Sequence, residues 1–294
     1  MSGSIRERGP VLVLGASSQI GYCLLPLLAG DGIRVSAVSR WPQTDARNVR
    51  WLRGSLPDGL TGEFADVEAV ACFAPLDALA AWLRRTPLPS LKRVVATSSM
   101  SAESKRESPV EAERALAQRL RDGEEALARA CEARGAAWTV LRPTLIYGVG
   151  RDRSLTPLAR RAARSRVFVL PSGGGLRQPV HAQDVASAVE AALRTSGTGG
   201  RIIPMGGGER LRAREMFARV RASLPVPTVP VPVPAPLILA CAHLLPPLRG
   251  PLTRLEQDLV ADNSDLGRML AVQPRDFRPD PSCWGDLLRR RTPA

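Results

Sequence analysis

The residues with the clearest chemical potential form a glycine- and serine-rich turn near the start of the chain. Residues 15–21 read Gly-Ala-Ser-Ser-Gln-Ile-Gly and follow the apolar run 11–14, which is typical of a strand buried on both faces. Gly15 permits a tight turn, and Gly21 lets the following helix lie close to the strand. We expect this helix to begin near Ser18 and to direct its free N–H groups and positive dipole end at a pyrophosphate. A turn of this kind that binds no ligand is the alternative.

The next strand indicates which dinucleotide would bind. Residues 33–38 alternate as a strand does and end in Ser39 and Arg40. An acidic residue here would bind the ribose hydroxyls of NAD, whereas a small residue and a cation suit the 2′-phosphate of NADP. We therefore predict NADP (NADPH) over NAD as the cofactor, and the alternative is an Arg40 that is merely solvated. From the turn itself, the expected cofactor-binding residues are Gly15, Ser17, Ser18, Gln19, Ile20 and Gly21.

These residues require a parallel sheet to position them. Apolar runs and amphipathic stretches alternate through the first half of the chain, which predicts a parallel sheet with right-handed crossovers. Ligands then lie at the carboxyl ends of the strands. Further strands are expected at 50–55, 69–74, 92–99 and 137–142, with helices at 76–85 and 111–134, the latter with an apolar face of Leu116, Leu120, Leu127 and Cys131. Further cofactor contacts are expected from Phe73, Ala74, Pro75, Thr97, Ser98, Pro143 and Thr144.

The second half of the chain has a different character. Prolines alternate through 224–236, which excludes helix and central strand; we expect this run to pack against a smaller region, and a linker or a partner ligand is the alternative. We predict an α/β fold with a Rossmann-like doubly wound parallel sheet. Residues 1–150 form the dinucleotide-binding domain, completed by 181–204, while 151–180 and 205–294 form a smaller substrate or cap region. The other expected elements are a flexible loop at 172–175, a helix at 184–193, a strand at 201–203 and helices at 237–245 and 254–260.

Composition excludes several classes of protein. Of the 294 residues 44% are hydrophobic and 23% charged, as in globular proteins. The five cysteines are scattered and never form Cys-x-x-Cys, so we expect neither disulfides nor a metal site, and a cytoplasmic location by default. The chain opens on polar residues, and its longest apolar stretch is too short to span a bilayer.

The net charge of +13 does not indicate a nucleic-acid or membrane partner. Lys92 and Lys105 are the only lysines among 41 basic residues, so the charge reflects a chain-wide arginine bias. Aromatic residues are 4% of the chain, too few for a stacking platform. One cluster of arginines, at positions 151, 153, 160, 161, 164 and 166, has two interpretations: a clamp for an anionic substrate such as a diphosphate, or a solvated helix face.

Four segments together resemble the extended short-chain dehydrogenase/reductase superfamily, in its NAD-dependent epimerase/dehydratase group. The turn at 15–21 is similar to the family's Gly-Ala-Thr-Gly-x-Ile-Gly, and 92–99 resembles its strand ending in Ser-Ser. Residues 141–148 resemble its Leu-Arg-Pro-x-x-x-Tyr-Gly, and 178–186 its Val-His-Val-x-Asp-Val-Ala. The resemblance covers about two-thirds of the chain, and residues 252–263 are similar to atypical members, including those related to an accessory subunit of respiratory complex I.

The catalytic pair of that family is missing. The resemblance implies a Tyr that transfers the substrate proton and a Lys four residues later that lowers its pKa, but Leu116 and Leu120 occupy these positions. Met100 stands where a Ser or Thr would bind the substrate carbonyl or hydroxyl. The resemblance therefore points to an atypical member and puts ordinary carbonyl reduction and 4-epimerisation in doubt.

Other groups are candidates for the missing acid. Tyr147 is the first choice, with a loop-capping role as the alternative for its hydroxyl, and Ser99 and Lys105 are further catalytic candidates. Lys105 either swings into the site or is a solvated loop lysine. His181 is expected to hold the element before the 184–193 helix.

Two functions remain open from the sequence. The first is an NADP-dependent oxidoreductase or nucleotide-sugar epimerase-like enzyme with a non-standard active site and a small anionic or nucleotide-linked substrate. Hydride transfer needs mainly positioning, which an apolar pocket of Leu116, Leu120 and Met100 still offers. The second is a non-catalytic NADP(H)-binding protein that acts as a structural or redox-sensing partner of another protein.

Overall fold

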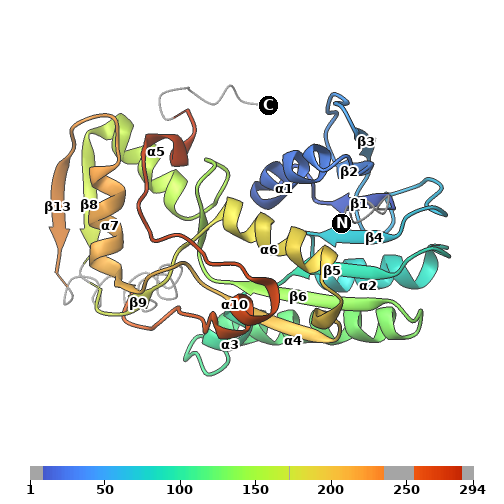
Figure 1. Ribbon diagram of the computed structural model, residues 1–294. Helices are drawn as coiled ribbons and strands as arrows, with labels where there is room; N and C mark the ends of the chain where they lie inside the picture. The colour runs from blue at the N-terminus through green and yellow to red at the C-terminus, as the bar shows by residue number, and fades with distance from the viewer. Residues whose placement is uncertain (1–8, 172, 235–254, 287–294) are drawn as a thin grey trace, which may run out of the picture.

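Seven strands form one parallel sheet at the centre of the molecule (Figure 1). The computed structural model describes residues 9–171, 173–234 and 255–286. Each apolar run pairs in parallel with its neighbours, which buries both faces of the sheet. In spatial order the strands are β11 (Arg201–Met205), β6 (Ala137–Pro143), β5 (Arg93–Thr97), β4 (Ala69–Cys72), β1 (Val11–Leu14), β2 (Val35–Ser39) and β3 (Val49–Arg53).

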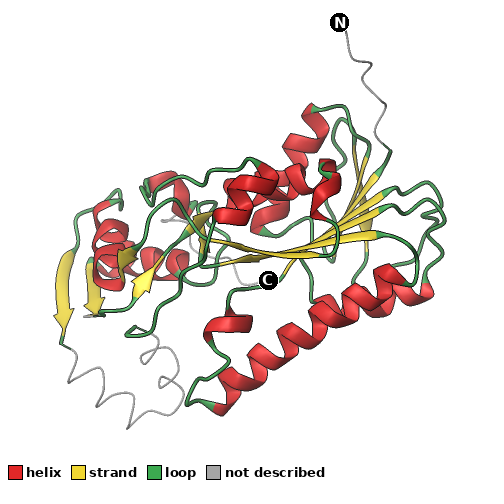
Figure 2. Cartoon of the chain, turned by 60° about the horizontal axis from the view of Figure 1, so that its bottom comes forward, coloured by secondary structure: helices red, strands yellow, loops and turns green. Residues whose placement is uncertain are grey.

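Helices cover both faces of this sheet (Figure 2). On one face α1 (Gln19–Gly30) packs beside α6 (Ala182–Arg194), and on the other α2 (Leu76–Arg85) packs beside α4 (Glu111–Glu132). Each pair buries its apolar side chains in a separate core against the strands. The predicted α/β fold with a doubly wound parallel sheet is confirmed, and the strands and helices expected before residue 143 are found within a few residues of their predicted bounds.

The strand order reverses between β1 and β4. β2 and β3 continue to one side of β1, whereas β4, β5, β6 and β11 lie on its other side. Such a reversal opens a crevice at the carboxyl ends of the two strands. The turn after β1 and residues 73–75 after β4 therefore meet at one place.

Helix α4 is turned differently from our expectation. Its buried residues are Glu113, Ala117, Gly123, Glu124, Leu127, Ala130 and Cys131. The predicted face of Leu116, Leu120, Leu127 and Cys131 is wrong in its first half, because Leu116 and Leu120 are only half-buried. The reason is a long-range ion pair: Glu124 is drawn inward to Arg142 of β6, whose Nε lies 2.9 Å from Glu124 Oε1.

The smaller region lies beyond the carboxyl ends of the strands (Figure 1). Its core gathers around Phe168, Tyr147 and Trp284. β13 (Val229–Val233) pairs with β8 (Val167–Pro171), and Val229 N donates to Arg166 O. Because successive residues of a strand point their N–H groups to opposite sides, Pro230 and Pro232 stand on the outer edge, where no donor is needed. The extended proline run thus packs against the smaller region as predicted.

The remaining described elements are short or lie in the smaller region. They are α3 (Ser101–Ser104), β7 (Ile146–Tyr147), α5 (Leu155–Ser165), β9 (Leu176–Arg177), β10 (Val180–His181), β12 (Leu211–Arg212), α7 (Ala213–Ala222), α10 (Ser264–Leu270) and two 3-10 turns, η1 (Ser196–Thr198) and η2 (Pro281–Trp284).

The helix predicted at 254–260 is wrong over its described residues. Residues 255–260 form a turn and then a bridge to β9, in which Leu259 N donates to Leu176 O and Gly175 N donates to Leu255 O. Their backbone groups are thus used by a distant segment instead of by a helix. In the same place a Cβ added to Gly173 would lie 2.9 Å from Leu255 O and one added to Gly175 would lie 2.5 Å from Gln257 O, so both glycines pack closely against 255–257, and the flexibility expected of 172–175 stays a prediction. The helix predicted at 237–245 lies outside the described residues.

None of the described helices combines the length and apolarity that crossing a bilayer requires. The four cysteines in the described part of the chain, Cys23, Cys72, Cys131 and Cys283, are buried free thiols.

Candidate functional site: a dinucleotide-binding turn and its crevice

The turn between β1 and α1 presents free backbone donors. Ser18 caps α1 by accepting Gly21 N at 3.2 Å, and Ser18 N donates to Gly15 O. The N–H groups of Ser17, Gln19 and Ile20 have no acceptor in the described part of the chain. The first turn of α1 also contains no acidic residue. Free N–H groups at a helix N-terminus without a nearby carboxylate make an anion-binding surface.

Two glycines make this turn possible. Gly15 has a φ of 73°, in the left-handed region, and a Cβ there would lie 3.3 Å from the carbonyl carbon of Phe73. No side chain fits at Gly21, because a Cβ there would lie 2.3 Å from Ala16 O. Helix α1 therefore lies as close to its strand as a backbone allows. The lack of a side chain at Gly15 also lets Phe73 lie directly against the turn.

The carboxyl end of β2 carries a basic hollow. Ser39 lies 3.4 Å from Ser17, hydroxyl to hydroxyl, which joins β2 to the turn. Next to it, Arg40 and Arg53 line a hollow of about 460 Å³ together with Gly54, Ser55 and Gly59. Neither guanidinium has a carboxylate partner among the described residues. Arg53 was not among the binding residues expected from the sequence. Its position at the end of the strand next to β2 could have indicated it.

Backbone hydrogen bonds from the residues after β5 and β6 to the neighbouring strands align the other strand ends. Ser98 N donates to Leu141 O, Met100 N to Pro143 O, and Thr144 N to Met205 O. The carboxyl ends of β5, β6 and β11 are thus held in one row. Two buried oxygen atoms here, Ser98 Oγ and Gln19 Oε1, have no partner in the described part of the molecule. Buried polar groups without partners indicate a place for a ligand or water, and the residues present fit a dinucleotide.

The positions of the absent catalytic pair lie beside this row. α3 begins two residues after Ser99 and packs against α4, where Arg121 Nη1 donates to Ala102 O at 2.7 Å. This contact places the stretch of α4 that carries Leu116 and Leu120 near the end of β5. Met100 is half-buried in the same area. The side chains at these three positions carry no ionisable group.

Ser99 and Lys105 are both engaged in local structure. Ser99 Oγ accepts the N–H of Ser101, the first residue of α3, at 3.1 Å. Lys105 is buried, and its Nζ lies 3.5 Å from Glu113 Oε1, which in turn belongs to a carboxylate that accepts the Ser108 hydroxyl at 2.8 Å. The alternative of a solvated loop lysine is therefore wrong. For Lys105 to swing towards a substrate, this buried ion pair would have to break.

Tyr147 lies inside the smaller region. It is 1% exposed, and its ring meets those of His181 and Phe277 edge-on, with centroids 5.2 Å and 4.8 Å away. Burial, reinforced by the nearby Cys283 and Asp184, raises the pKa of the phenol. Its hydroxyl has no hydrogen-bond partner in the described part of the chain. Both the position and the raised pKa weigh against Tyr147 as the substitute acid.

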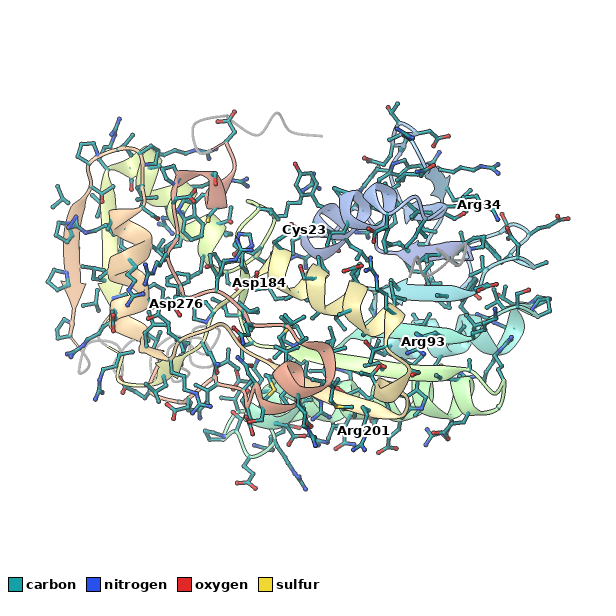
Figure 3. All side chains as sticks on the ribbon, viewed as in Figure 1. Cys23, Arg34, Arg93, Asp184, Arg201 and Asp276 are labelled. Atoms are coloured by element: carbon teal, nitrogen blue, oxygen red, sulfur yellow. The ribbon has the colours of Figure 1, made fainter. Side chains whose placement is uncertain are left out.

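His181 and Asp184 tie the smaller region to the sheet. His181 Nδ1 accepts Gln183 N at 3.1 Å and caps α6, the structural role expected for it, and burial lowers its pKa. The Asp184 carboxylate accepts the backbone N–H and the Nε of Arg275, each at 2.9 Å. Figure 3 places Asp184 near Cys23 of α1, where the two helices meet. Burial raises the pKa of the Cys23 thiol to about 11, so we expect this thiol to stay protonated at neutral pH.

The arginines of 151–166 do not form one cluster. Arg151 reaches the glycine-rich turn, where its Nη1 donates to Ser17 O at 3.0 Å. Arg160 Nη2 donates instead to Gly150 O within its own region. Arg161 and Arg164 are exposed on α5 and Arg166 ends that helix, as expected for a solvated face.

No group of His, Cys, Asp and Glu in the described residues is arranged to hold a metal ion.

The chain is similar to one protein family in sequence and to several solved structures in fold. Residues 75–206 match the model of the NAD dependent epimerase/dehydratase family. No curated protein matches the chain in sequence. The solved structure of MoeE5 in complex with UDP-glucuronic acid and NAD is similar with a TM-score of 0.70 at 19% identity, over 94% of this chain and 97% of that one.

Two epimerases from Bacillus cereus are also similar. The UDP-glucuronic acid 4-epimerase, solved in complex with NAD, gives a TM-score of 0.69 at 14% identity over 93% of this chain and 96% of that one. The UDP-N-acetylglucosamine 4-epimerase gives 0.65 at 13% identity over 95% of each chain. At these identities the likeness establishes a shared fold.

Proposed function

We propose that the protein binds a nicotinamide dinucleotide at the turn after β1, from the premise that residues 75–206 match the model of the NAD dependent epimerase/dehydratase family. The observation that carries the proposal is the set of free N–H groups on Ser17, Gln19 and Ile20 at a turn closed by Gly21. MoeE5 and the UDP-glucuronic acid 4-epimerase were both solved with NAD, which supports a nicotinamide dinucleotide as the class of ligand.

We further propose that NADP binds in preference to NAD. The support is specific to this chain: Arg40 and Arg53 line one hollow at the carboxyl ends of β2 and β3, where the 2′-phosphate of NADP is recognised in folds of this kind. A phosphate there would receive charge-assisted hydrogen bonds from two guanidinium groups that lack carboxylate partners among the described residues.

Replacing Arg40 by alanine tests this preference. We expect the Kd for NADPH to rise by about tenfold or more, because a charge-assisted hydrogen bond contributes about 1.5–3 kcal/mol. The Kd for NADH should change less than about twofold, since NADH has no 2′-phosphate. Arg47→Ala is the matched control, an exposed arginine of the same loop without a described contact. Titration by tryptophan fluorescence is suitable because Trp41, beside Arg40, is 69% exposed. An equal loss for both coenzymes would refute the 2′-phosphate role.

The chemistry that we propose is that of an epimerase-like oxidoreductase without the usual proton-handling pair. A bound dinucleotide supplies hydride transfer, which depends mainly on positioning. Leu116, Leu120 and Met100 would line an apolar wall against a nucleotide-linked small molecule. The similar proteins were solved with UDP-glucuronic acid or act on UDP-sugars by name, and this supports a nucleotide-linked substrate.

A second candidate is a non-catalytic NADP(H)-binding protein that signals to a protein partner. It is favoured by the contacts of the three residues that the sequence offered as substitutes for the missing acid. Ser99 Oγ accepts Ser101 N, Lys105 is paired with Glu113, and Tyr147 packs among aromatic rings. Lys105 would have to break its ion pair before it could transfer a proton to a substrate, and burial raises the pKa of the Tyr147 phenol.

Replacing Tyr147 by phenylalanine tests whether the Tyr147 hydroxyl acts as the acid. The ring contacts persist and the hydroxyl has no described hydrogen bond. We therefore expect the Kd for NADPH, and any NADPH turnover with carbonyl or nucleotide-sugar substrates, to stay within about twofold of the unmodified protein, a change of at most about 0.4 kcal/mol. The measurement is steady-state oxidation of NADPH beside a binding titration. Loss of turnover with intact NADPH binding would restore Tyr147 as the acid.

A further inference from the structure

A side chain from the smaller region reaches across to the dinucleotide-binding turn. Arg151 follows β7, 134 residues after the turn, yet its Nη1 donates to Ser17 O at 3.0 Å. Its guanidinium carbon lies 4.8 Å from the centroid of the Tyr22 ring. Ser17 belongs to the turn and Tyr22 to the first turns of α1, so the guanidinium is fixed at the mouth of the proposed pyrophosphate site by two separate contacts.

The charge of Arg151 is not neutralised in the described part of the protein. Arg151 is exposed and has no carboxylate partner among those residues, and the first turn of α1 has no acidic side chain. A guanidinium has five N–H donors in a fixed fork. One contact with a carbonyl and one with a ring face leave most of these donors unused. Arg160 differs, because its described hydrogen bond goes to Gly150 O of its own region.

We propose that Arg151 is a further cofactor-binding residue, which donates to the diphosphate of the dinucleotide beside the N-terminus of α1. This assignment rests on the proposed function and deepens it. The planar fork of an arginine suits two oxygen atoms of a diphosphate. The ring of Tyr22 holds the guanidinium in place by a cation–π contact. The contact joins the smaller region directly to the cofactor.

The assignment differs from the substrate clamp that the arginine cluster suggested. A diphosphate occurs both in the coenzyme and in a nucleotide-linked sugar, and its chemistry is the same in each. The geometry favours the coenzyme, because Ser17 O and the Tyr22 ring lie on the turn itself. It also predicts a pattern unlike that of Arg40. NADPH and NADH share the diphosphate and should depend on Arg151 equally.

The test is a set of titrations on the full chain with Arg151→Gln and the control Arg153→Gln. Arg153 is an exposed arginine two residues away without a described contact. We expect Arg151→Gln to raise the Kd for both NADPH and NADH by about tenfold, the loss of one charge-assisted contact. Arg153→Gln should leave both within about twofold. The Kd should also become less dependent on salt in Arg151→Gln.

Three other results of these titrations would overturn the assignment of Arg151. If uridine diphosphate loses affinity in Arg151→Gln while both coenzymes keep theirs, Arg151 serves the substrate and the assignment is overturned. If all three ligands bind Arg151→Gln as they bind the unmodified protein, the assignment alone is overturned. If the unmodified protein takes up neither coenzyme, the proposed function falls, and this assignment with it.

A second pair of variants tests the part played by the ring. Tyr22→Phe keeps an aromatic face and should bind both coenzymes as the unmodified protein does. Tyr22→Leu should weaken both by about threefold, as expected for a partly exposed cation–π contact. Equal affinities in the two variants would show that the ring does not hold Arg151.

Discussion

Replacing Glu124 by glutamine should lower the free energy of unfolding by about 3 kcal/mol, because it breaks a buried ion pair and leaves its partner uncompensated. Glu124 is 2% exposed, and its Oε1 accepts Arg142 Nε at 2.9 Å, while its second oxygen contacts Arg142 Nη2. A glutamine would turn an N–H₂ group towards the guanidinium. Glu103, 2.6 Å from Arg142 Nη1, remains as a partial partner.

Glu125→Gln is the control for this change. Glu125 is the next residue of α4 and pairs with Arg129 at the surface, where the two side chains are 67% and 69% exposed. We expect it to cost no more than about 0.5 kcal/mol. Urea denaturation of the two variants gives both values. If the two losses are equal and small, the pair between α4 and β6 does not hold the helix in place.

Replacing Gly21 by alanine should cost the protein both stability and its cofactor. The new Cβ would lie 2.3 Å from Ala16 O and 2.7 Å from Ala16 Cα, and these are backbone atoms that no side-chain rotation can move. Helix α1 must then shift away from β1. We expect a loss of about 2 kcal/mol or more in unfolding free energy. The Kd for NADPH should rise at least about tenfold, because the free N–H groups move with the helix.

Gly30→Ala separates this effect from helix propensity. Gly30 ends the same helix, and a Cβ added there would meet nothing within 4 Å beyond its own helix and chain neighbours. The change should leave the Kd unaltered and raise stability by up to about 1 kcal/mol. Thermal or chemical denaturation beside a coenzyme titration measures both. A Gly21→Ala protein as stable and as tight-binding as Gly30→Ala would contradict the close packing of α1 on β1.

Local chemistry made much of the sheet and its turn predictable. The apolar run before Gly15, the Ser18 cap and the spacing to Gly21 all fall within residues 11–21, and the structure has a strand, turn and helix there. The sheet followed from repeated runs of the same kind. Such features depend on residues that are close in the chain, so they can be recognised in the sequence.

Long-range pairing accounts for what could not be predicted. Residues 255–260 have a helical pattern, but their backbone pairs with the distant strand β9. The face of α4 is set by Glu124 and Arg142, which no periodicity reveals. The contact of Arg151 with Ser17 likewise spans two regions of the chain. Leu116 and Leu120 could be aligned from the sequence, but the engagement of Lys105 with Glu113 could not.

The proposed function requires the N–H groups of Ser17, Gln19 and Ile20 to hold a nicotinamide dinucleotide. Calorimetric titration of the full chain with NADPH and with NADH tests it most directly, with Gly21→Ala as the matched negative. We expect uptake of one coenzyme per chain, with NADPH bound more tightly than NADH, and weak uptake by the variant. Folded protein that takes up neither coenzyme would contradict it.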